Sequence, residues 1–236
     1  MLPIEIQKNF ISFRSEIELI TKKCGRLTDT IKIVGVTKNQ PIEHIIAAVL
    51  TGLQDIGENY VQELRAKYQL LSHLEIRWHF IGRIQTNKIK YLVPIVYMVH
   101  SVDRESVAIE LNRQAEKYNR VLDILLQVNT SGEQTKAGVL PDLVPNLLST
   151  VLSLRHLRPR GLMTLAGLEH SPEQVRAEFR LLRILRDELA HRFGLEYFTE
   201  LSMGMSNDYP IAIEEGATIL RIGTRIFGER PSPKTS

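Results

Sequence analysis

The sequence has one cysteine, Cys24, among 236 residues, which excludes an internal disulfide bond and a zinc site built on several thiolates. It also lacks any run of about 20 apolar residues, the length that a membrane-spanning helix needs. The N-terminal segment carries acidic residues and no long apolar stretch, so it does not resemble a signal peptide. We therefore expect a cytoplasmic protein with no membrane segment.

An excess of charge of one sign is missing as well. The chain has 30 Lys and Arg residues against 27 Asp and Glu residues, and its formal net charge at pH 7 is +3. This balance gives no reason to expect binding to nucleic acid or to a membrane surface. No segment rich in Pro, Gly or Ser divides the chain, so we expect one globular domain over residues 1–230 and a disordered tail at 231–236.

What the sequence does have is a regular alternation of short β-branched runs with amphipathic segments. After an opening helix at 4–24, strands are predicted at 31–38, 53–59, 76–82, 96–102, 122–129, 157–166, 198–204 and 218–228. Helices are predicted between them at 41–52, 61–71, 87–93, 104–118, 142–154, 171–194 and 209–216. This α/β order predicts a single-domain (β/α)8 barrel of the TIM type with an extra N-terminal helix. A doubly wound open sheet is the alternative, because periodicity does not prove closure.

Small hydroxyl-bearing residues and glycines gather after the seventh and the eighth predicted strand. In barrels of this type, the loops after these two strands often hold a phosphate group with backbone N–H groups and a helix start. We expect the hydroxyl groups to add donors, the glycines to let the backbone approach the anion, and Asn207 or Asp208 to cap the next helix. The alternative is that these residues only form turns. They are Ser202, Gly204, Ser206, Asn207, Gly223 and Thr224.

Lys38 stands at the end of the first predicted strand, which is the neighbour of the eighth strand in a closed barrel. Because side chains alternate along a strand, Lys38 shares the inward face of Val34 and Val36. A partly desolvated amine at the barrel mouth is nucleophilic and can form a Schiff base with an aldehyde. The alternative is an ordinary solvated lysine.

Arg221 is the second charged residue that the alternation places inside the barrel. Leu220 and Ile222 flank it, and if those two face the helices, Arg221 points inward. A buried guanidinium needs a partner, which could be Glu58 or another acid, or a ligand atom beside the phosphate. An amine for an aldehyde, a cation and a phosphate site are the parts needed to hold pyridoxal 5'-phosphate (PLP).

These residues belong to segments in which the sequence resembles the family of pyridoxal phosphate homeostasis proteins over nearly its whole length. The similar segments are, in order, VGVTKNQP, DIGENYVQE, WHFIGRIQTNK, VDR, LLQVNTSGEQTKAG, GLMTL and LSMGMSNDYPIAIEEGATILRIGTRIFGER. The resemblance implies a barrel of the alanine-racemase type (fold type III) with PLP at its C-terminal mouth. VTKNQP departs from the common VSKTKP only beyond the lysine.

The resemblance also implies a role for individual residues in the matching segments. Lys38 would carry the aldimine, and Arg221 would approach the pyridine nitrogen of the cofactor. Asn59 in GENY and His79 in WHFIG would lie near the cofactor. The residues on the phosphate would be Ser206, Gly223 and Thr224.

Three functions remain open. An arginine cannot accept the proton of the pyridine nitrogen, so the ring would stay largely neutral and stabilise carbanions weakly. We therefore expect a monomeric protein that holds PLP in intracellular vitamin B6 homeostasis without robust turnover, with apo PLP-dependent enzymes as candidate recipients. The alternatives are a PLP-dependent amino-acid racemase, which needs a second base such as Tyr60, His79 or Tyr209, and a cofactor-free barrel enzyme that acts on a phosphorylated substrate.

Other charged residues carry less weight. Lys88 and Lys136 are rival amines, and Lys136 is a candidate to receive PLP secondarily. His73 and His79 lack the spacing of a zinc site, so no metal is expected. The mouth candidates after the fourth strand are His100 and Asp103. Along 171–194, the arginines are expected on a solvated face balanced by acids of the same helix. The arginines are Arg176, Arg180, Arg183 and Arg186, and the acids are Glu173, Glu178, Asp187 and Glu188.

Overall fold

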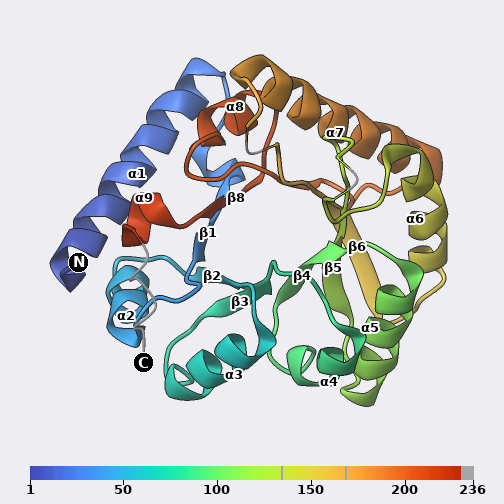
Figure 1. Cartoon of the computed structure of the whole chain (residues 1–236), viewed down its shortest axis with the longest axis horizontal. Helices are drawn as coiled ribbons and strands as arrows, with labels where there is room; N and C mark the ends of the chain where they lie inside the picture. The colour runs from blue at the N-terminus through green and yellow to red at the C-terminus, as the bar shows by residue number, and fades with distance from the viewer. Residues whose placement is uncertain (134, 168, 230–236) are drawn as a thin grey trace.

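Eight short parallel strands close into a barrel at the centre of the protein (Figure 1). The strands are β1 (Lys32–Val36), β2 (Asp55–Glu58), β3 (Arg77–Phe80), β4 (Met98–Val102), β5 (Leu122–Gln127), β6 (Leu157–Met163), β7 (Glu200–Ser202) and β8 (Ile219–Ile222). Each strand pairs with the next along the chain, and β8 pairs back with β1, where Val34 lies opposite Arg221. This closure confirms the predicted barrel and excludes the open sheet. The computed structural model describes residues 1–133, 135–167 and 169–229.

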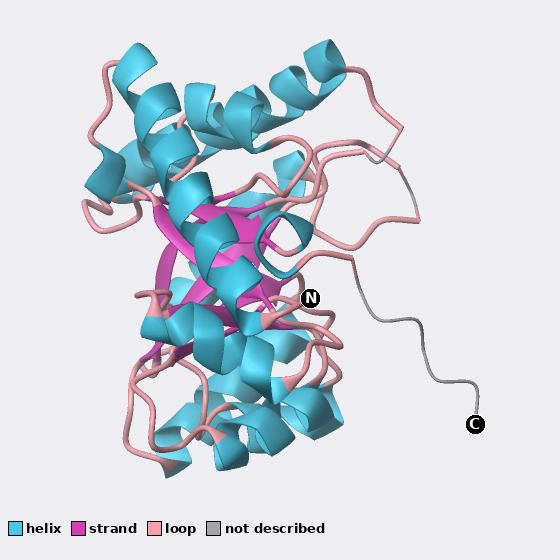
Figure 2. Ribbon diagram, turned by 90° about the vertical axis from the view of Figure 1, so that its left-hand side faces the viewer, coloured by secondary structure: helices cyan, strands magenta, loops and turns pink. Residues whose placement is uncertain are grey.

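The helices form a ring outside the strands, which Figure 1 shows from one end and Figure 2 from the side. The α-helices are α1 (Pro3–Lys23), α2 (Ile42–Leu50), α3 (Val61–Leu70), α4 (Ile89–Leu92), α5 (Glu105–Lys117), α6 (Val144–Leu152), α7 (Pro172–Phe193), α8 (Tyr209–Glu214) and α9 (Thr224–Phe227). Short 3-10 turns occur at η1 (Thr28–Thr30), η2 (Thr86–Lys88) and η3 (Pro141–Leu143). The extra helix α1 packs on α2, α8 and α9 and so covers the seam between β8 and β1.

The strands end earlier than the sequence predicts at the two places that matter for the site. The predicted strand 218–228 is wrong beyond Ile222, because Gly223 leaves the extended conformation (φ −109°, ψ −82°) and residues 224–227 form α9. The turn buries Ile226 and Phe227 beneath α1, and this packing overrides their β-propensity. β1 ends at Val36, so Lys38 lies in the following turn rather than on the strand.

The alternation of side chains along the strands divides the core into an inner and an outer layer. Leu220 and Ile222 join the outer core between the strands and the helices, as predicted. Inside the barrel, the apolar layer is small and is followed by buried polar side chains, Arg221 among them. The residues of that inner apolar layer are Val34, Met98, Leu125, Met163 and Ile219. A TIM barrel usually fills its interior with apolar layers, so the polar replacement is a feature of this chain.

The arginines of α7 pair with acids of their own helix only in part: Arg186 bonds to Asp187 at 2.6 Å, but Arg176 and Arg180 do not pair within α7. Arg176 and Arg180 bond to Glu215 just after α8, where Arg180 Nη2 lies 2.9 Å from Glu215 Oε1. The exposed fraction of Glu215 is 4%. Arg176 and Arg180 therefore tie α7 to α8, the helix that follows the first cluster of small residues. The prediction that acids of α7 balance these arginines is confirmed for Arg186 and was wrong for Arg176 and Arg180, because their partner Glu215 is distant in sequence.

None of the helices within the described ranges is both long and apolar enough to cross a lipid bilayer. The predicted tail at 231–236 lies outside the described residues.

Candidate functional site

A cavity of about 290 Å³ opens at the C-terminal end of the barrel, over β1, β6, β7 and β8. Of the predicted site residues, Ser206, Arg221, Gly223 and Thr224 line it together. Its other lining residues are Val36, Ala166, Gly167, Met205, Asn207 and Asp208. The two clusters of small residues therefore meet in space, although about 20 residues of chain separate them. We call this space the β7–β8 pocket.

The wall of the β7–β8 pocket contains backbone N–H groups that are free to donate hydrogen bonds to a ligand. The backbone N–H groups of Ser206, Asn207, Gly223 and Thr224 have no hydrogen-bond partner within the described residues. Such groups at the mouth of a barrel are what a phosphate group binds. The Ser206 hydroxyl already accepts a hydrogen bond from Arg225 N at 3.4 Å, so the two loops are in direct contact.

Gly204 allows the first of these loops to turn. Its φ is +95°, and a Cβ at this position would lie 2.6 Å from Ala212 Cβ. Two further bonds fix the loop: Arg221 N donates to Gly204 O at 2.9 Å, and Met205 N donates to Asp208 Oδ1 at 2.5 Å. Asp208 occupies the N-cap position of α8, as predicted, but its side chain makes no cap bond.

Arg221 is buried at the base of the pocket, with an exposed fraction of 3%. Its Nη1 donates to Ser202 Oγ at 2.6 Å and its Nη2 donates to Thr164 O at 2.7 Å. Burial lowers the pKa of Arg221 to about 10, against the opposing charge of Asp208, so the guanidinium stays charged at neutral pH. The ion pair with Glu58 that the sequence allowed is not formed, and Arg221 makes no ion pair with a described carboxylate.

A chain of buried side chains continues from Arg221 across the barrel interior. His100 Nδ1 lies 2.9 Å from Ser202 Oγ, and His100 Nε2 lies 2.8 Å from His79 Nδ1. His79 Nε2 lies 2.9 Å from Asp55 Oδ1. Asp55 in turn accepts two hydrogen bonds of 2.7 Å from Arg77 at the opposite end of the barrel.

The direction of each hydrogen bond in this chain follows from its two ends. Arg221 can only donate, and an ionised Asp55 can only accept. With both imidazoles neutral and protonated on Nε2, Ser202 donates to His100, His100 to His79, and His79 to Asp55, so every group is satisfied. Burial lowers the pKa of His100 well below its usual value, and the charge of Arg221 acts in the same direction.

Asp55 is the ionised end of the chain. Burial alone would raise its pKa, but hydrogen bonds from Arg77 and His79 outweigh burial and lower the pKa to about 2. His79 and His100 both lie in the barrel interior, where the exposed fraction of each is 0%. The interpretation of His100 as a residue of the mouth is therefore wrong. Sequence reasoning missed Asp55 as the anchor, although its place at the start of a buried strand was a signal that it needs a partner.

Lys38 lies half-buried in the turn after β1, two residues beyond Val36 of the pocket wall. Its Nζ lies 4.9 Å from the centre of the Tyr60 ring, which is a cation–π distance. Lys38 makes no ion pair with any carboxylate in the described part of the chain. Its amine is therefore available to a ligand at the mouth.

The turn that carries Lys38 is held by a buried cluster. Lys67 Nζ donates to Thr37 O at 2.5 Å and to Glu58 Oε1 at 2.7 Å. Asn39, with φ 59°, donates its N–H to Glu63 Oε1 at 2.6 Å. Burial raises the pKa of Glu58 in spite of the nearby Lys67.

Asn59, like Lys38, is a predicted site residue that does not line the β7–β8 pocket. It follows β2 and lines a separate cavity together with Tyr60, not the β7–β8 pocket. The loops after β2 and β3 touch there, since a Cβ on Gly82 would lie 2.0 Å from Asn59 O.

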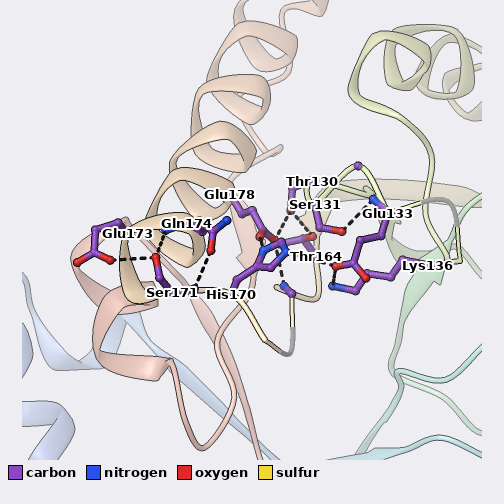
Figure 3. A network of polar contacts seen from close by, with 12 residues as sticks. Thr130, Ser131, Glu133, Lys136, Thr164, His170, Ser171, Glu173, Gln174 and Glu178 are labelled. Carbon is purple, nitrogen blue, oxygen red and sulfur yellow. Dashed lines mark hydrogen bonds and ion pairs between the residues drawn. The ribbon is translucent and has the colours of Figure 1, made fainter.

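A second polar network supports the wall of the pocket at Gly167 (Figure 3). Glu178 of α7 is buried, with an exposed fraction of 5%, and accepts from Gly167 N at 3.3 Å. It also bonds to His170 and lies 3.4 Å from Thr130 Oγ1, which in turn is 2.8 Å from Thr164 Oγ1. Glu178 thus joins the loops after β5 and β6, and its expected place on a solvated face was wrong.

Lys136, the rival amine, lies on the loop after β5 and is half-buried. Its Nζ lies 2.8 Å from Glu133 Oε1 (Figure 3). An amine engaged by a carboxylate is a weaker nucleophile than a free one, so the geometry favours Lys38 over Lys136.

The geometry defines a class: a (β/α)8 barrel with a pocket lined by backbone N–H groups after β7 and β8, a buried arginine at its base and a lysine after β1. The model of the family "Alanine racemase, N-terminal domain" matches residues 12–231. A curated relative from Aquifex aeolicus (strain VF5), named Pyridoxal phosphate homeostasis protein, is 47% identical over 217 residues, which are 91% of this chain and 95% of that protein. The chain belongs to the family of pyridoxal phosphate homeostasis proteins.

Solved structures agree with this assignment. PipY of Synechococcus elongatus PCC7942, solved with PLP bound, is 34% identical and superposes with a TM-score of 0.85 over 94% of this chain and 100% of that chain. An alanine racemase of Clostridium difficile 630 is 17% identical, with a TM-score of 0.74 over 96% of this chain and 58% of that chain. The racemase is therefore similar in fold alone.

Proposed function

We propose that this protein binds PLP at the C-terminal mouth of its barrel and acts in intracellular PLP homeostasis. The observation that carries the proposal is the convergence of unpaired backbone N–H groups and the buried cation Arg221 in one pocket, with the free amine of Lys38 beyond its wall. The family membership and the PLP-bound structure of PipY support the same function.

Each part of the proposed site has a separate task. The phosphate group would bind the N–H groups and hydroxyls of Ser206, Gly223 and Thr224. Arg221 would face the pyridine nitrogen, and Lys38 would hold the aldehyde carbon as a Schiff base. We place Asn59 beside the cofactor on the strength of the resemblance alone, since it lines another cavity.

We infer that the protein is a carrier rather than an efficient enzyme. When bound, PLP supplies an electron sink, and this sink is strong only if its ring nitrogen is protonated. Arg221 cannot take part in that protonation, and its hydrogen bonds to Ser202 and Thr164 hold it in place as a donor. We further propose that the protein belongs to fold type III and is a cytoplasmic monomer. Its proposed recipients of PLP are apo-enzymes.

The racemase alternative depends on a second base. His79 is enclosed within the barrel, and Tyr209 Oη donates to Glu16 at 2.7 Å on the α1 side. Tyr60 is the candidate that lies beside Lys38. Incubating the PLP-loaded protein with L- and D-amino acids in deuterated water separates the two functions. The carrier proposal predicts no sustained exchange of the α-proton, and sustained exchange would favour the racemase.

The proposed lysine is tested by the visible absorption of the PLP-loaded protein. Lys38→Ala should abolish the band, and Lys136→Ala, the matched control on another mouth loop, should keep it. Reduction with borohydride followed by mass spectrometry should locate the cofactor on the peptide that contains Lys38. A Lys38→Ala protein with an unchanged band would overturn the assignment. A colourless wild-type protein after incubation with PLP would overturn the function itself.

A further inference from the structure

A second and larger cavity, of about 750 Å³, lies at the same end of the barrel over β2, β3 and β4. We call it the β2–β4 cavity. Its volume falls within the range of small-molecule sites. Of the residues proposed to hold the cofactor, Asn59 lines this cavity, whereas Ser206, Arg221, Gly223 and Thr224 line the β7–β8 pocket. Polar side chains dominate the lining of the β2–β4 cavity. Those on which the inference rests are Tyr60, Gln62, Arg83, Gln85, Asn87 and Lys88.

The charged side chains that line the β2–β4 cavity are all positive among the described residues. Arg83 and Lys88 line it, and neither makes an ion pair or a side-chain hydrogen bond with the described part of the chain. A third cation, Arg104, is already engaged by Asp103 at 2.5 Å and by Ile84 O at 2.8 Å. No Asp or Glu is among the described lining residues. Two uncompensated cations in one concave site attract and hold an anion.

The backbone beneath these side chains is fixed. Ile81 N donates to Glu58 O at 2.9 Å, and Ser101 Oγ donates to Gly82 O at 2.6 Å. Arg104 holds Ile84 O, as noted above. The backbone of the loop that carries Arg83 is therefore anchored at Ile81, Gly82 and Ile84, while the Arg83 guanidinium has no partner within the described residues. Such a site loses little backbone entropy when a ligand binds.

Tyr60 connects the cavity to the proposed cofactor lysine. It lines the β2–β4 cavity, and the centre of its ring lies 4.9 Å from Lys38 Nζ. A ligand in the cavity would thus lie one side chain away from Lys38, on the side opposite to the β7–β8 pocket.

We propose that the β2–β4 cavity is a second ligand site, which takes a small organic anion. Arg83 and Lys88 hold its carboxylate or phosphate group, and the amides of Gln62, Gln85 and Asn87 bind the polar remainder. Amides donate and accept, so they suit the hydroxyl, amino or carbonyl groups of a metabolite. The inference goes beyond the proposed function, because it does not require that PLP binds at Lys38.

Calorimetric titration of the PLP-loaded protein tests the second site, since the cofactor then occupies the β7–β8 pocket. The probes are inorganic phosphate and succinate, which distinguish a phosphate site from a carboxylate site. Saturable binding of at least one probe is expected. Arg83→Gln and Lys88→Gln should each weaken it about tenfold, the loss of one charge-assisted hydrogen bond. Lys90→Gln is the matched control, because Lys90 lies on α4 and does not line the cavity.

Two outcomes overturn the inference. One is the absence of saturable binding for both probes up to about 10 mM, the weak limit for a specific small-anion site. The other is binding that Arg83→Gln and Lys88→Gln leave unchanged. Neither outcome affects the proposed function, which stands or fails on PLP uptake. If PLP does not load, the same titration is run with apo-protein and Thr224→Val added, which separates the β2–β4 cavity from the β7–β8 pocket.

Discussion

The two sides of the barrel mouth offer different kinds of hydrogen-bond donor to a ligand. On the side of β7 and β8, the donors are backbone N–H groups, and the one cation, Arg221, is buried and held by Ser202 and Thr164. On the side of β2 to β4, the donors are the charged side chains of Arg83 and Lys88, which have no partners in the described structure. We therefore expect the first side to fit one anion geometry and the second to adapt to several.

The difference also extends below the surface. Arg221 stands at the end of a hydrogen-bonded chain that runs through His100 and His79 to Asp55. Arg83 is fixed only through the backbone of its loop. Substitutions on the first side should therefore affect both ligand binding and folding, whereas substitutions on the second side should affect ligand binding alone.

The largest expected effect is that of Arg221→Met. The variant removes the buried cation and leaves Ser202 Oγ and Thr164 O without their donor, so the free energy of unfolding should fall by about 2–3 kcal/mol. The affinity for PLP should fall by about a hundredfold. Urea unfolding and titration with PLP measure the two effects. Arg221→Met with the stability and affinity of the wild type would remove the basis of the comparison.

His100→Phe should have the next largest effect on stability. It leaves Ser202 and His79 each without one buried partner, at a cost of about 2 kcal/mol to the free energy of unfolding. Because burial lowers the pKa of His100, the wild-type imidazole should remain neutral well below its usual midpoint in an NMR titration. A midpoint near the usual value of about 6.5 would contradict the assigned hydrogen-bond directions.

Asp55 makes the free energy of unfolding depend on pH. Its pKa is about 2 in the folded protein, below its ordinary value of 3.8, so the ionised carboxylate stabilises the fold above about pH 4. This contribution, about 2 kcal/mol, is lost as the pH falls from about 4 towards 2. Asp55→Asn should flatten the acid limb of a stability–pH curve. If Asp55→Asn keeps the wild-type slope, the acid sensitivity comes from other carboxylates.

The smallest expected effect is that of Arg83→Gln on folding. The free energy of unfolding should change by less than about 0.5 kcal/mol, because the guanidinium has no partner within the described residues. PLP loading should also be unchanged. A loss of stability comparable with that of Arg221→Met would show that the two sides of the mouth are built alike.

Much of this site is predictable from local sequence patterns. The alternation of Leu220, Arg221 and Ile222 places the arginine inside the barrel, and the structure agrees. The glycine and hydroxyl clusters after the last two strands predict one shared pocket, and they line one. Glu178 was misjudged, although its position three residues after Val175 on the apolar stripe of α7 was a signal of burial.

Other features depend on partners that no local pattern identifies. His100 has the sequence context of a mouth residue, but its ring is oriented by His79 and Ser202 on two other strands. Asn59 belongs to a motif that resembles a cofactor-binding segment, and it lines the β2–β4 cavity, where its backbone carbonyl lies close to Gly82. The prediction for the end of β8 was also wrong, because the packing of Phe227 beneath α1 determines where the strand ends.

The sequence by itself determined the order of strands and helices, the residues that face inward, and the family, because alternation and motifs are properties of neighbouring residues. Only the tertiary structure decided which inward side chains meet, as His100 does with Ser202 of β7. The physical reason is that such contacts depend on the register between strands and on barrel closure, which join residues far apart in the chain.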